Sequence, residues 1–273
     1  FNRGPWFGRM IGGDQPMTLH FCTPSHTSGT KGLQRGHVLI EPQSDAEFNR
    51  MKHRLKGAWV LVGGTNSGWP LPHSAKDDSI RAEQKAKNAE IAKKNNEIRM
   101  KNRMNGTNEP MLKMEEVPGL YYREMIEAGV LGFIQSSTVP IRALYDRPMI
   151  NDKSTTFDNL PEVCDIKLDE NQYIVIKKMA QERREFWLEF DIRNHFKLGP
   201  IKYHNVVASI KGTHYPDEYV IISGHLDAFD VATGGVDCGT GIAPMMEAAR
   251  LIALSGAKPK RTILFVAFAA EEF

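Results

Sequence analysis

The chain has 273 residues, of which 41% are hydrophobic and 25% charged, and its formal net charge is +2. This balance is typical of a globular protein with one large or two ordinary domains, and it favours neither nucleic acid nor a membrane surface as a partner. No apolar run approaches the roughly 20 residues of a membrane-spanning helix, so we expect no membrane span. The three cysteines stand too far apart in the sequence for a disulfide framework or a Cys-x-x-Cys metal site. They are Cys22, Cys164 and Cys238.

Residues 1–35 are rich in Gly, Pro, Ser and Thr and show no clear period, so we expect an irregular lead-in. Because the chain begins with Phe1 rather than Met, we also expect a processed, trimmed or omitted N-terminus. Strand and helix patterns then alternate as far as residue 182, which predicts a mixed α/β unit. No internal repeat is apparent. A helix is predicted over 170–182 with three apolar residues facing inward: Ile174, Ile176 and Met179.

Residues 76–104 contain no Gly or Pro, few large apolar residues, and many Ala, Lys, Glu, Gln and Arg, which favour helices. Asp77 and Asp78 stand where a helix N-terminus favours negative charge, and Asn105-Gly106 would end the helix. The segment therefore predicts a long solvated helix or a helical hairpin inserted in a loop. A basic arm for nucleic acid is disfavoured because acidic residues are interspersed and no aromatic residue is present.

The pattern becomes clearer within residues 186–273, which open on a half-exposed strand. Residues 219–224 are continuously apolar, as in a central strand covered on both faces. A helix is predicted over 242–254, and a second buried strand over 262–269. Strand, helix and strand in this order predict a βαβ unit with parallel strands.

Polar residues follow both buried strands of this unit. His225 and Asp227 come directly after the first strand, and Glu271 and Glu272 come after the second. Between them, a glycine-rich loop that leads into the helix carries Asp237. Because ligands bind beyond the carboxyl ends of parallel strands, we expect this histidine and these four carboxylates to converge.

These residue types suit metal-dependent hydrolysis. The imidazole of His225 can bind a divalent ion, and Asp227 can fix the other ring nitrogen. On its flexible loop, Asp237 can bridge two ions. Of Glu271 and Glu272, one can face a metal while the other takes a proton from the activated water. Alone, each residue would be an ordinary polar group at a strand end, and only their convergence favours a metal site.

Segment 219–273 resembles the co-catalytic di-zinc exopeptidases that include bacterial leucyl aminopeptidase and plasma glutamate carboxypeptidase. The matching motifs are G-H-x-D, then G-x-D-x-G-x-G before a helix, then an apolar strand ending in A-E-E. The resemblance implies that His225 and Asp237 bind one zinc ion and that Asp237 and Glu272 bind the other. It makes Glu271 the general base and Asp227 the partner of His225.

The same resemblance concerns the residue after the bridging aspartate. It places a cis peptide bond between Asp237 and Cys238. The cysteine replaces the Asp or Asn that is more usual in the family, a change that we expect to be harmless.

Residues 36–185 resemble the protease-associated domain that many of these enzymes insert before the catalytic core, a non-catalytic domain that usually shapes or covers the substrate cleft. The matching stretches are LKGAWVLVGG and EMIEAGVLGFIQSS. The expected organisation is thus an irregular lead-in over 1–35, this domain over 36–185, and the N-terminal half of a zinc peptidase domain over 186–273. The expected fold class is α/β, with a partial mixed and parallel sheet in the catalytic half.

The resemblance implies an exopeptidase that hydrolyses a terminal bond of a peptide substrate with zinc-activated water, an aminopeptidase more readily than a carboxypeptidase. It further implies a secreted or periplasmic location and leaves a homodimer open. The family has two more ligands, an acidic residue after the next strand and a late histidine. Because these would follow Phe273, we expect this chain to be an inactive fragment with a weak metal site. The second strand, 262–269, would then lie open on one side.

Two other functions remain open. A glutaminyl cyclase-like zinc enzyme would keep much of this constellation, although the protease-associated insertion argues against it. A receptor-like binding module would keep the architecture but would have lost its metal ligands. The candidate ligands are intact in this sequence, which argues against such a module.

Overall fold

The computed structural model divides the chain into two compact units, Phe1–Leu198 and Gly199–Phe273, and each is described by itself. The expected boundary after residue 185 was wrong, because strand β8 (Phe186–His195) pairs with two strands of the first unit. Residues 138–161, within the expected protease-associated domain, lie outside the described part of the chain. The structure describes residues 2–13, 15–24, 27–66, 68, 71–137, 162–195, 200–229 and 232–272.

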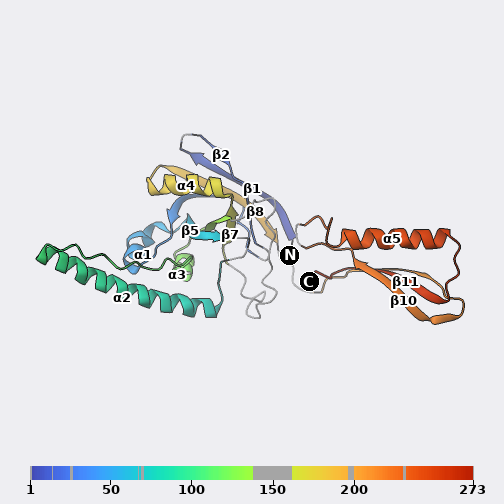
Figure 1. Cartoon of the computed structure of the whole chain (residues 1–273). Coiled ribbons are helices and arrows are strands. Elements are labelled where there is room, and N and C mark those ends of the chain that lie inside the picture. The colour runs from blue at the N-terminus through green and yellow to red at the C-terminus, as the bar shows by residue number, and fades with distance from the viewer. Residues whose placement is uncertain are drawn as a thin grey trace. The chain divides into compact units, whose positions relative to one another are not determined.

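The first unit is built on a mixed sheet with the strand order β2-β1-β8-β4-β5-β6-β7-β3 in its described part (Figure 1). The four strands from β4 to β7 run parallel to one another, and the outer pairings are antiparallel. The mixed α/β prediction for this region is therefore confirmed. The remaining strands are β1 (Asn2–Gly12), β2 (Met17–Thr18), β3 (Phe21–Cys22), β4 (Gln34–Ile40), β5 (Ala58–Asn66), β6 (Gly132–Ser137) and β7 (Cys164–Leu168).

The expectation of an irregular lead-in was wrong, because β1 pairs with β8 along most of its length. Its glycines misled the prediction, since glycine in a strand often marks a close approach rather than a break. A Cβ on Gly8 would lie 2.7 Å from the ring of Phe21 and 2.9 Å from the ring of Phe190. Glycine at this position therefore makes room for the aromatic core.

Alternate residues of β5 face two separate cores. Trp59 and Leu61 join one hydrophobic cluster, whereas Val60 and Val62 join the other. Helix α4 covers the first face, and α1, α2 and α3 lie on the opposite side (Figure 1). The helices are α1 (Asp45–Met51), continued by the short 3₁₀ helix η1 (Lys52–Arg54), then α2 (Ala75–Asn105), α3 (Tyr122–Glu127) and α4 (Glu170–Gln181).

Helix α4 presents a face that differs from the predicted one by one residue. Ile176 and Met179 are buried as expected, but Ile174 is 58% exposed. Tyr173 takes the inward position, and its hydroxyl donates to the carbonyl of Val62 at 2.6 Å. The ring of Tyr173 packs in the apolar core while its hydroxyl bonds to the sheet. The prediction counted only apolar residues and therefore placed Ile174 inward instead of Tyr173.

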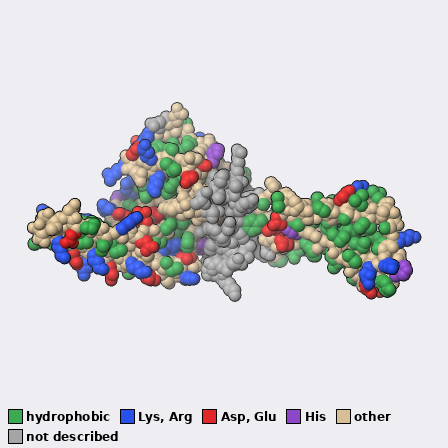
Figure 2. Space-filling view, in the orientation of Figure 1, with side chains coloured by type: hydrophobic (Ala, Val, Ile, Leu, Met, Phe, Trp, Pro, Cys, Tyr) green, Lys and Arg blue, Asp and Glu red, His purple; other side chains and the backbone are tan. Residues whose placement is uncertain are grey.

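Helix α2 is one continuous helix of 31 residues and not a hairpin. Ser74 begins it with a capping box to Asp77, and Gly106 ends it with φ of 64°. Side chains of both charge signs run along it in Figure 2. The solvated helix predicted for this segment is therefore confirmed.

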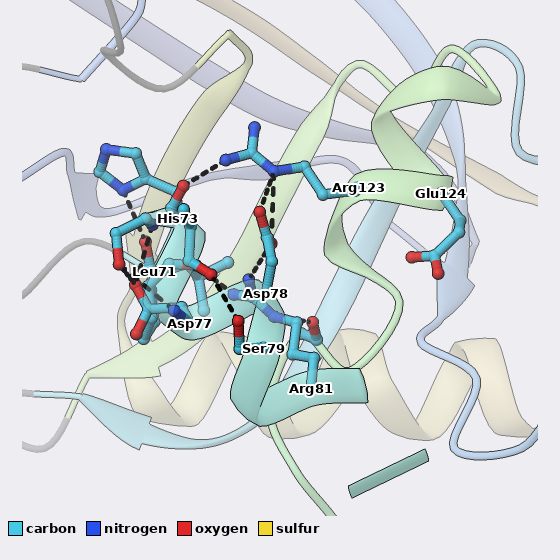
Figure 3. A network of polar contacts seen from close by, with 12 residues as sticks. Leu71, His73, Asp77, Asp78, Ser79, Arg81, Arg123 and Glu124 are labelled. Atoms are coloured by element: carbon cyan, nitrogen blue, oxygen red, sulfur yellow. Dashed lines mark hydrogen bonds and ion pairs between the residues drawn. The ribbon is translucent and has the colours of Figure 1, made fainter. Parts of the chain in front are cut away.

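Two arginines fix the first turns of α2 to α3 (Figure 3). Arg81 of α2 and Arg123 of α3 both donate to the carboxylate of Asp78, at 2.9 and 3.1 Å. Arg123 also donates to the backbone carbonyl of His73, just before the helix. Asp78 thus joins two helices, in addition to providing the negative charge expected near the N-terminus.

The outer part of α2 is covered by the extended residues 107–117, here called the strap. Asn95 forms two hydrogen bonds with the peptide groups of Leu112, at 2.7 and 2.8 Å, and Asn102 does the same with Glu109, at 2.8 and 2.9 Å. Seven helical residues rise about 10.5 Å, close to the roughly 10 Å spanned by three extended residues. The seven-residue spacing of Asn95 and Asn102 on the helix therefore matches the three-residue spacing of Glu109 and Leu112 on the strap. This spacing was not among the predictions from the sequence.

Replacing Asn95 with Ala is expected to release the strap locally. Loss of net hydrogen bonding of about 1 kcal/mol would speed exchange of the Leu112 amide hydrogen about fivefold. Hydrogen exchange followed by mass spectrometry measures this rate. The matched control is Asn96→Ala, one residue along on the exposed side of the helix. Equal exchange at Leu112 in both variants would show that the asparagine contacts do not hold the strap.

A chain of hydrogen bonds crosses the carboxyl ends of the four parallel strands. Glu41 follows β4 and accepts from the backbone N–H groups of Gly63 and Gly119, each at 2.6 Å. The side chain of Gln135 donates to the carbonyl of Gly63 at 2.8 Å and accepts from Lys167 at 3.1 Å. The network thus ties the sheet to the loop that returns from the strap.

Burial raises the pKa of Glu41 from 4.5 to about 7, although its two backbone hydrogen bonds oppose this shift. The folded protein favours the protonated form of Glu41 more than the unfolded chain does. The resulting contribution to the free energy of unfolding is present in full below pH 4.5 and is lost as the pH rises to about 7. The difference corresponds to about 3 kcal/mol. Over this window, the free energy of unfolding should fall for the native chain relative to Glu41→Gln. Urea unfolding at several pH values tests this, with the exposed Glu83→Gln as control, and parallel pH curves for all three proteins would contradict it.

The second unit contains a three-stranded sheet with the order β10-β11-β9 in its described part. Strands β10 and β11 are parallel and joined through α5, so the predicted βαβ unit is confirmed, while β9 runs antiparallel to β11. Strand β11 has partners on both sides, which corrects the expectation that it would lie open, because β9 occupies the second edge. The elements are β9 (Val206–Ile210), β10 (Tyr215–His225), α5 (Gly239–Leu254) and β11 (Arg261–Phe268).

Helix α5 covers one face of this sheet, where Met245, Phe265 and Ala267 form a small core. The expectation that residues 219–224 are covered on both faces was wrong, because α5 covers only one face and Ile221 is 61% exposed. Hydrophobic side chains accordingly occupy much of the surface of this unit in Figure 2. Among the described residues, no helix combines the length and apolar character needed to cross a membrane.

Candidate metal centre

The candidate site lies at the carboxyl ends of β10 and β11. His225 is the last residue of β10, and its register partner, Phe268, is the last residue of β11. The chain then turns at Ala270, whose φ is 61°, before reaching Glu271 and Glu272. Parallel pairing therefore delivers the imidazole and the glutamate pair to the same edge of the sheet, as the sequence predicts.

Three predicted residues lie around the ring of His225. Its Nε2 lies 2.9 Å from Oδ1 of Asp237 and 3.9 Å from Oε2 of Glu271. Its Nδ1 lies 3.0 Å from the backbone carbonyl of Asp227 and 3.4 Å from a carboxylate oxygen of the same residue. Either oxygen of Asp227 favours a proton on Nδ1, which leaves Nε2 to face the other carboxylates.

Asp227 is held from behind by the end of the neighbouring strand. Its Oδ2 accepts from the backbone N–H of Glu272 at 3.1 Å. Burial acts to raise the pKa of Asp227, but backbone hydrogen bonds from Glu272 and Glu271 outweigh it and lower the pKa. Its buried Oδ1 has no hydrogen-bond partner among the described residues. The hydrogen bond to Nδ1 of His225 therefore comes from the backbone carbonyl of Asp227, and the carboxylate lies behind it.

The surroundings of His225 favour a positive charge on its ring. Burial lowers its pKa, but the hydrogen bonds to the Asp237 carboxylate and the Asp227 carbonyl outweigh this effect and raise the pKa to about 8. A cation bound at this point would replace the proton in the same field of negative charge. The donor set of imidazole and carboxylates is one that zinc accepts. The residues present therefore fit a divalent metal.

Two groups of ligand atoms lie close enough to hold an ion, with all atoms of a group within 4.8 Å of one another. One contains His225, Glu271 and Glu272, and the other contains His225, Asp237 and Cys238. Both groups share His225, but neither contains both Asp237 and Glu272, the predicted ligands of the second ion. The distances do not distinguish the base from the ligand within the glutamate pair.

Cys238 is the residue that the sequence analysis underrated. The peptide bond between Asp237 and Cys238 is cis, as the resemblance implied. The cysteine was treated only as a harmless replacement, although its thiol belongs to one of the two ligand groups. Its position next to Asp237 was the available signal.

Comparisons with known proteins agree with this geometry. Residues 205–273 match the model described as Peptidase family M28. The match covers about a quarter of the chain, and over it the chain is similar to the M28 peptidases. Because the M28 segment contains all the predicted site residues, its resemblance to the co-catalytic zinc exopeptidases is confirmed.

Curated relatives align over short stretches. Carboxypeptidase Q of Rattus norvegicus is 43% identical over 83 residues, which cover 29% of this chain and 18% of that protein. A probable zinc metalloprotease of Pyrenophora tritici-repentis is 40% identical over 103 residues, covering 35% of this chain and 23% of that protein. The matches thus span less than a quarter of these relatives, whose names are consistent with a zinc metallopeptidase hydrolase.

Solved structures align over nearly the whole chain at low identity. A peptidase M28 precursor from Shewanella amazonensis is 18% identical with a TM-score of 0.45, covering 99% of this chain and 52% of that one. A zinc aminopeptidase from Bacillus subtilis is 12% identical with a TM-score of 0.46, covering 98% of this chain and 48% of that one. Both TM-scores lie below 0.5, so these alignments add nothing to the family match.

Proposed function

We propose that the whole protein is a zinc-dependent exopeptidase that hydrolyses a terminal bond of a peptide substrate. The observation that carries this proposal is the convergence of an imidazole and acidic side chains at the ends of β10 and β11, inside the M28 segment. The names of the curated relatives support the same reaction class.

Each residue has a role in this proposal. His225 would hold zinc through Nε2 while Asp227 holds Nδ1, and Asp237 would be a ligand shared with a second zinc ion. Glu272 would be one ligand of the second ion, and Glu271 would take a proton from the attacking water. Bound zinc would supply Lewis acidity, which makes the water more acidic and polarises the scissile carbonyl.

The first test of this proposal is zinc binding by the chain itself. Removing an outer-shell partner of a metal site usually costs 10–100-fold in affinity, so loss of a direct ligand in His225→Ala should cost at least about 100-fold. A competition titration against a chromophoric chelator measures the affinity. His214→Ala is the matched control, an exposed histidine of the same unit. Equal zinc affinity in the native chain and both variants would exclude His225 as a ligand.

The terminus that is cleaved is part of the proposal. The motifs favour an aminopeptidase, whereas several of the curated relatives are named carboxypeptidases. Dipeptides blocked either at the amino or at the carboxyl end separate the two specificities. An aminopeptidase cleaves only those with a free amino end, and a carboxypeptidase only those with a free carboxylate. Cleavage of neither type by the zinc-loaded whole protein would contradict the exopeptidase assignment.

The first unit is proposed to correspond to the protease-associated domain, in a form whose sheet includes both β1 and β8. Its role would be to shape access of the peptide to the site. A secreted or periplasmic location and a homodimer remain part of the same proposal.

A further inference from the structure

The sulfur of Cys238 occupies a space that two glycines leave for it. A Cβ on Gly241, in the first turn of α5, would lie 2.6 Å from Sγ, and one on Gly224 of β10 would lie 3.5 Å from it. The thiol is therefore wedged between the strand that carries His225 and the helix that follows Asp237. Its position is set by the fold and not by a free surface rotamer.

The same sulfur lies within ligand range of the candidate metal centre. Its Sγ, a ring nitrogen of His225 and a carboxylate oxygen of Asp237 all lie within 4.8 Å of one another. Nitrogen and sulfur ligands of a tetrahedral zinc ion are roughly 3.5 Å apart, as follows from Zn–N and Zn–S distances of about 2.0 and 2.3 Å. The 4.8 Å limit exceeds this separation by about 1.3 Å, so binding of an ion would draw these atoms together.

We propose that Cys238 is a third ligand, as a thiolate, of the ion bound by His225 and Asp237. This inference rests on the proposed function and adds a sulfur donor to it. When the sulfur–metal bond forms, the thiol proton is released to water. Thiolates favour zinc and other thiophilic ions over manganese, magnesium or calcium. The site would therefore select a softer metal than a site made of imidazole and carboxylates alone.

The other two cysteines do not compete for this role. Cys22 and Cys164 are buried in the first unit, and neither belongs to a metal-ligand group among the described residues. Burial raises the pKa of Cys164 to about 12, which keeps its thiol protonated. A thiolate–metal signal from the native chain can therefore be assigned to Cys238 by a single substitution.

The test is titration of the chain with Co²⁺, followed by absorption spectroscopy. We expect visible d–d bands from the bound ion together with a near-ultraviolet thiolate-to-cobalt charge-transfer band. Cys238→Ser and Cys238→Ala should lose the charge-transfer band and keep the d–d bands, since His225 and Asp237 remain. In parallel, the Kd for Cd²⁺ should rise at least tenfold in both variants, whereas the Kd for Mn²⁺ should change less than twofold.

The outcomes distinguish this inference from the proposed function. Visible d–d bands without a charge-transfer band in the native chain would show that the metal binds but the thiol does not. A charge-transfer band that survives in Cys238→Ala, with unchanged circular dichroism, would assign the signal to another cysteine. If no cobalt absorption appears at all, the chain does not form the metal centre, and both proposals are contradicted.

Discussion

In the whole protein loaded with zinc, replacing Glu271 with Gln is expected to lower kcat by about 10²–10⁴-fold, because general acid–base catalysis contributes a factor of this size. The amide keeps the shape of the side chain but cannot take a proton from water. Zinc content should be unchanged, since His225, Asp237 and Glu272 remain in place. Steady-state kinetics on a dipeptide and metal analysis of the same sample provide the two measurements.

Glu272→Gln is the matched control, because the two glutamates are adjacent and both reach the ring of His225. If Glu272 is a ligand, the Glu272→Gln variant should contain less zinc than the native protein. Excess zinc should partly restore the activity of this variant. If Glu271→Gln loses zinc while Glu272→Gln retains it, the two roles are exchanged. Full activity in Glu271→Gln would remove the general base from the mechanism.

Replacing Lys167 with Met is expected to lower the free energy of unfolding of the first unit by about 3–5 kcal/mol, the usual cost of leaving one member of a buried ion pair alone. The side chain of Lys167 is fully buried, and its Nζ donates to Asp165 at 2.8 Å. The carboxylate of Asp165 also accepts from the backbone N–H of Leu71 at 2.6 Å. Urea denaturation followed by tryptophan fluorescence measures the change.

Two controls show whether the unpaired charge causes this loss. Arg193→Met removes an exposed partner of Asp191 and should cost less than about 1 kcal/mol, as exposed pairs do. The double variant Lys167→Met with Asp165→Leu should recover part of the stability, because no buried charge is left unpaired. A loss below about 1 kcal/mol in Lys167→Met itself would show that the ion pair does not matter for folding.

The elements with a strong local signal were predicted from the sequence. Helix α2 is specified by composition and by its ends, since Ser74, Asp77 and Gly106 make local contacts that need no partner element. The apolar runs of β5 and β11 likewise predict buried strands by their length and composition. Strand β1 was missed because its glycines signal a break locally, whereas the groups that crowd them, such as the ring of Phe190 against Gly8, come from distant parts of the chain.

The network around Lys167 shows what local patterns cannot supply. Its members come from β5, β6, β7 and the loops after β4 and β5, and they meet only when the parallel strands align. Nothing in the immediate sequence of Lys167 distinguishes it from an exposed lysine. Its burial and its partner are properties of the assembled sheet.

By itself, the sequence predicted which residues would carry the chemistry: one histidine, four carboxylates and a glycine loop, each placed at or near the end of a predicted element. The tertiary structure decided how they meet, because the parallel register of β10 and β11 sets His225 beside Glu271 and Glu272. It also decided that Cys238 points into the same site, between two glycines. Distances between side chains depend on the pairing of strands that are far apart in the chain, which residue order alone does not encode.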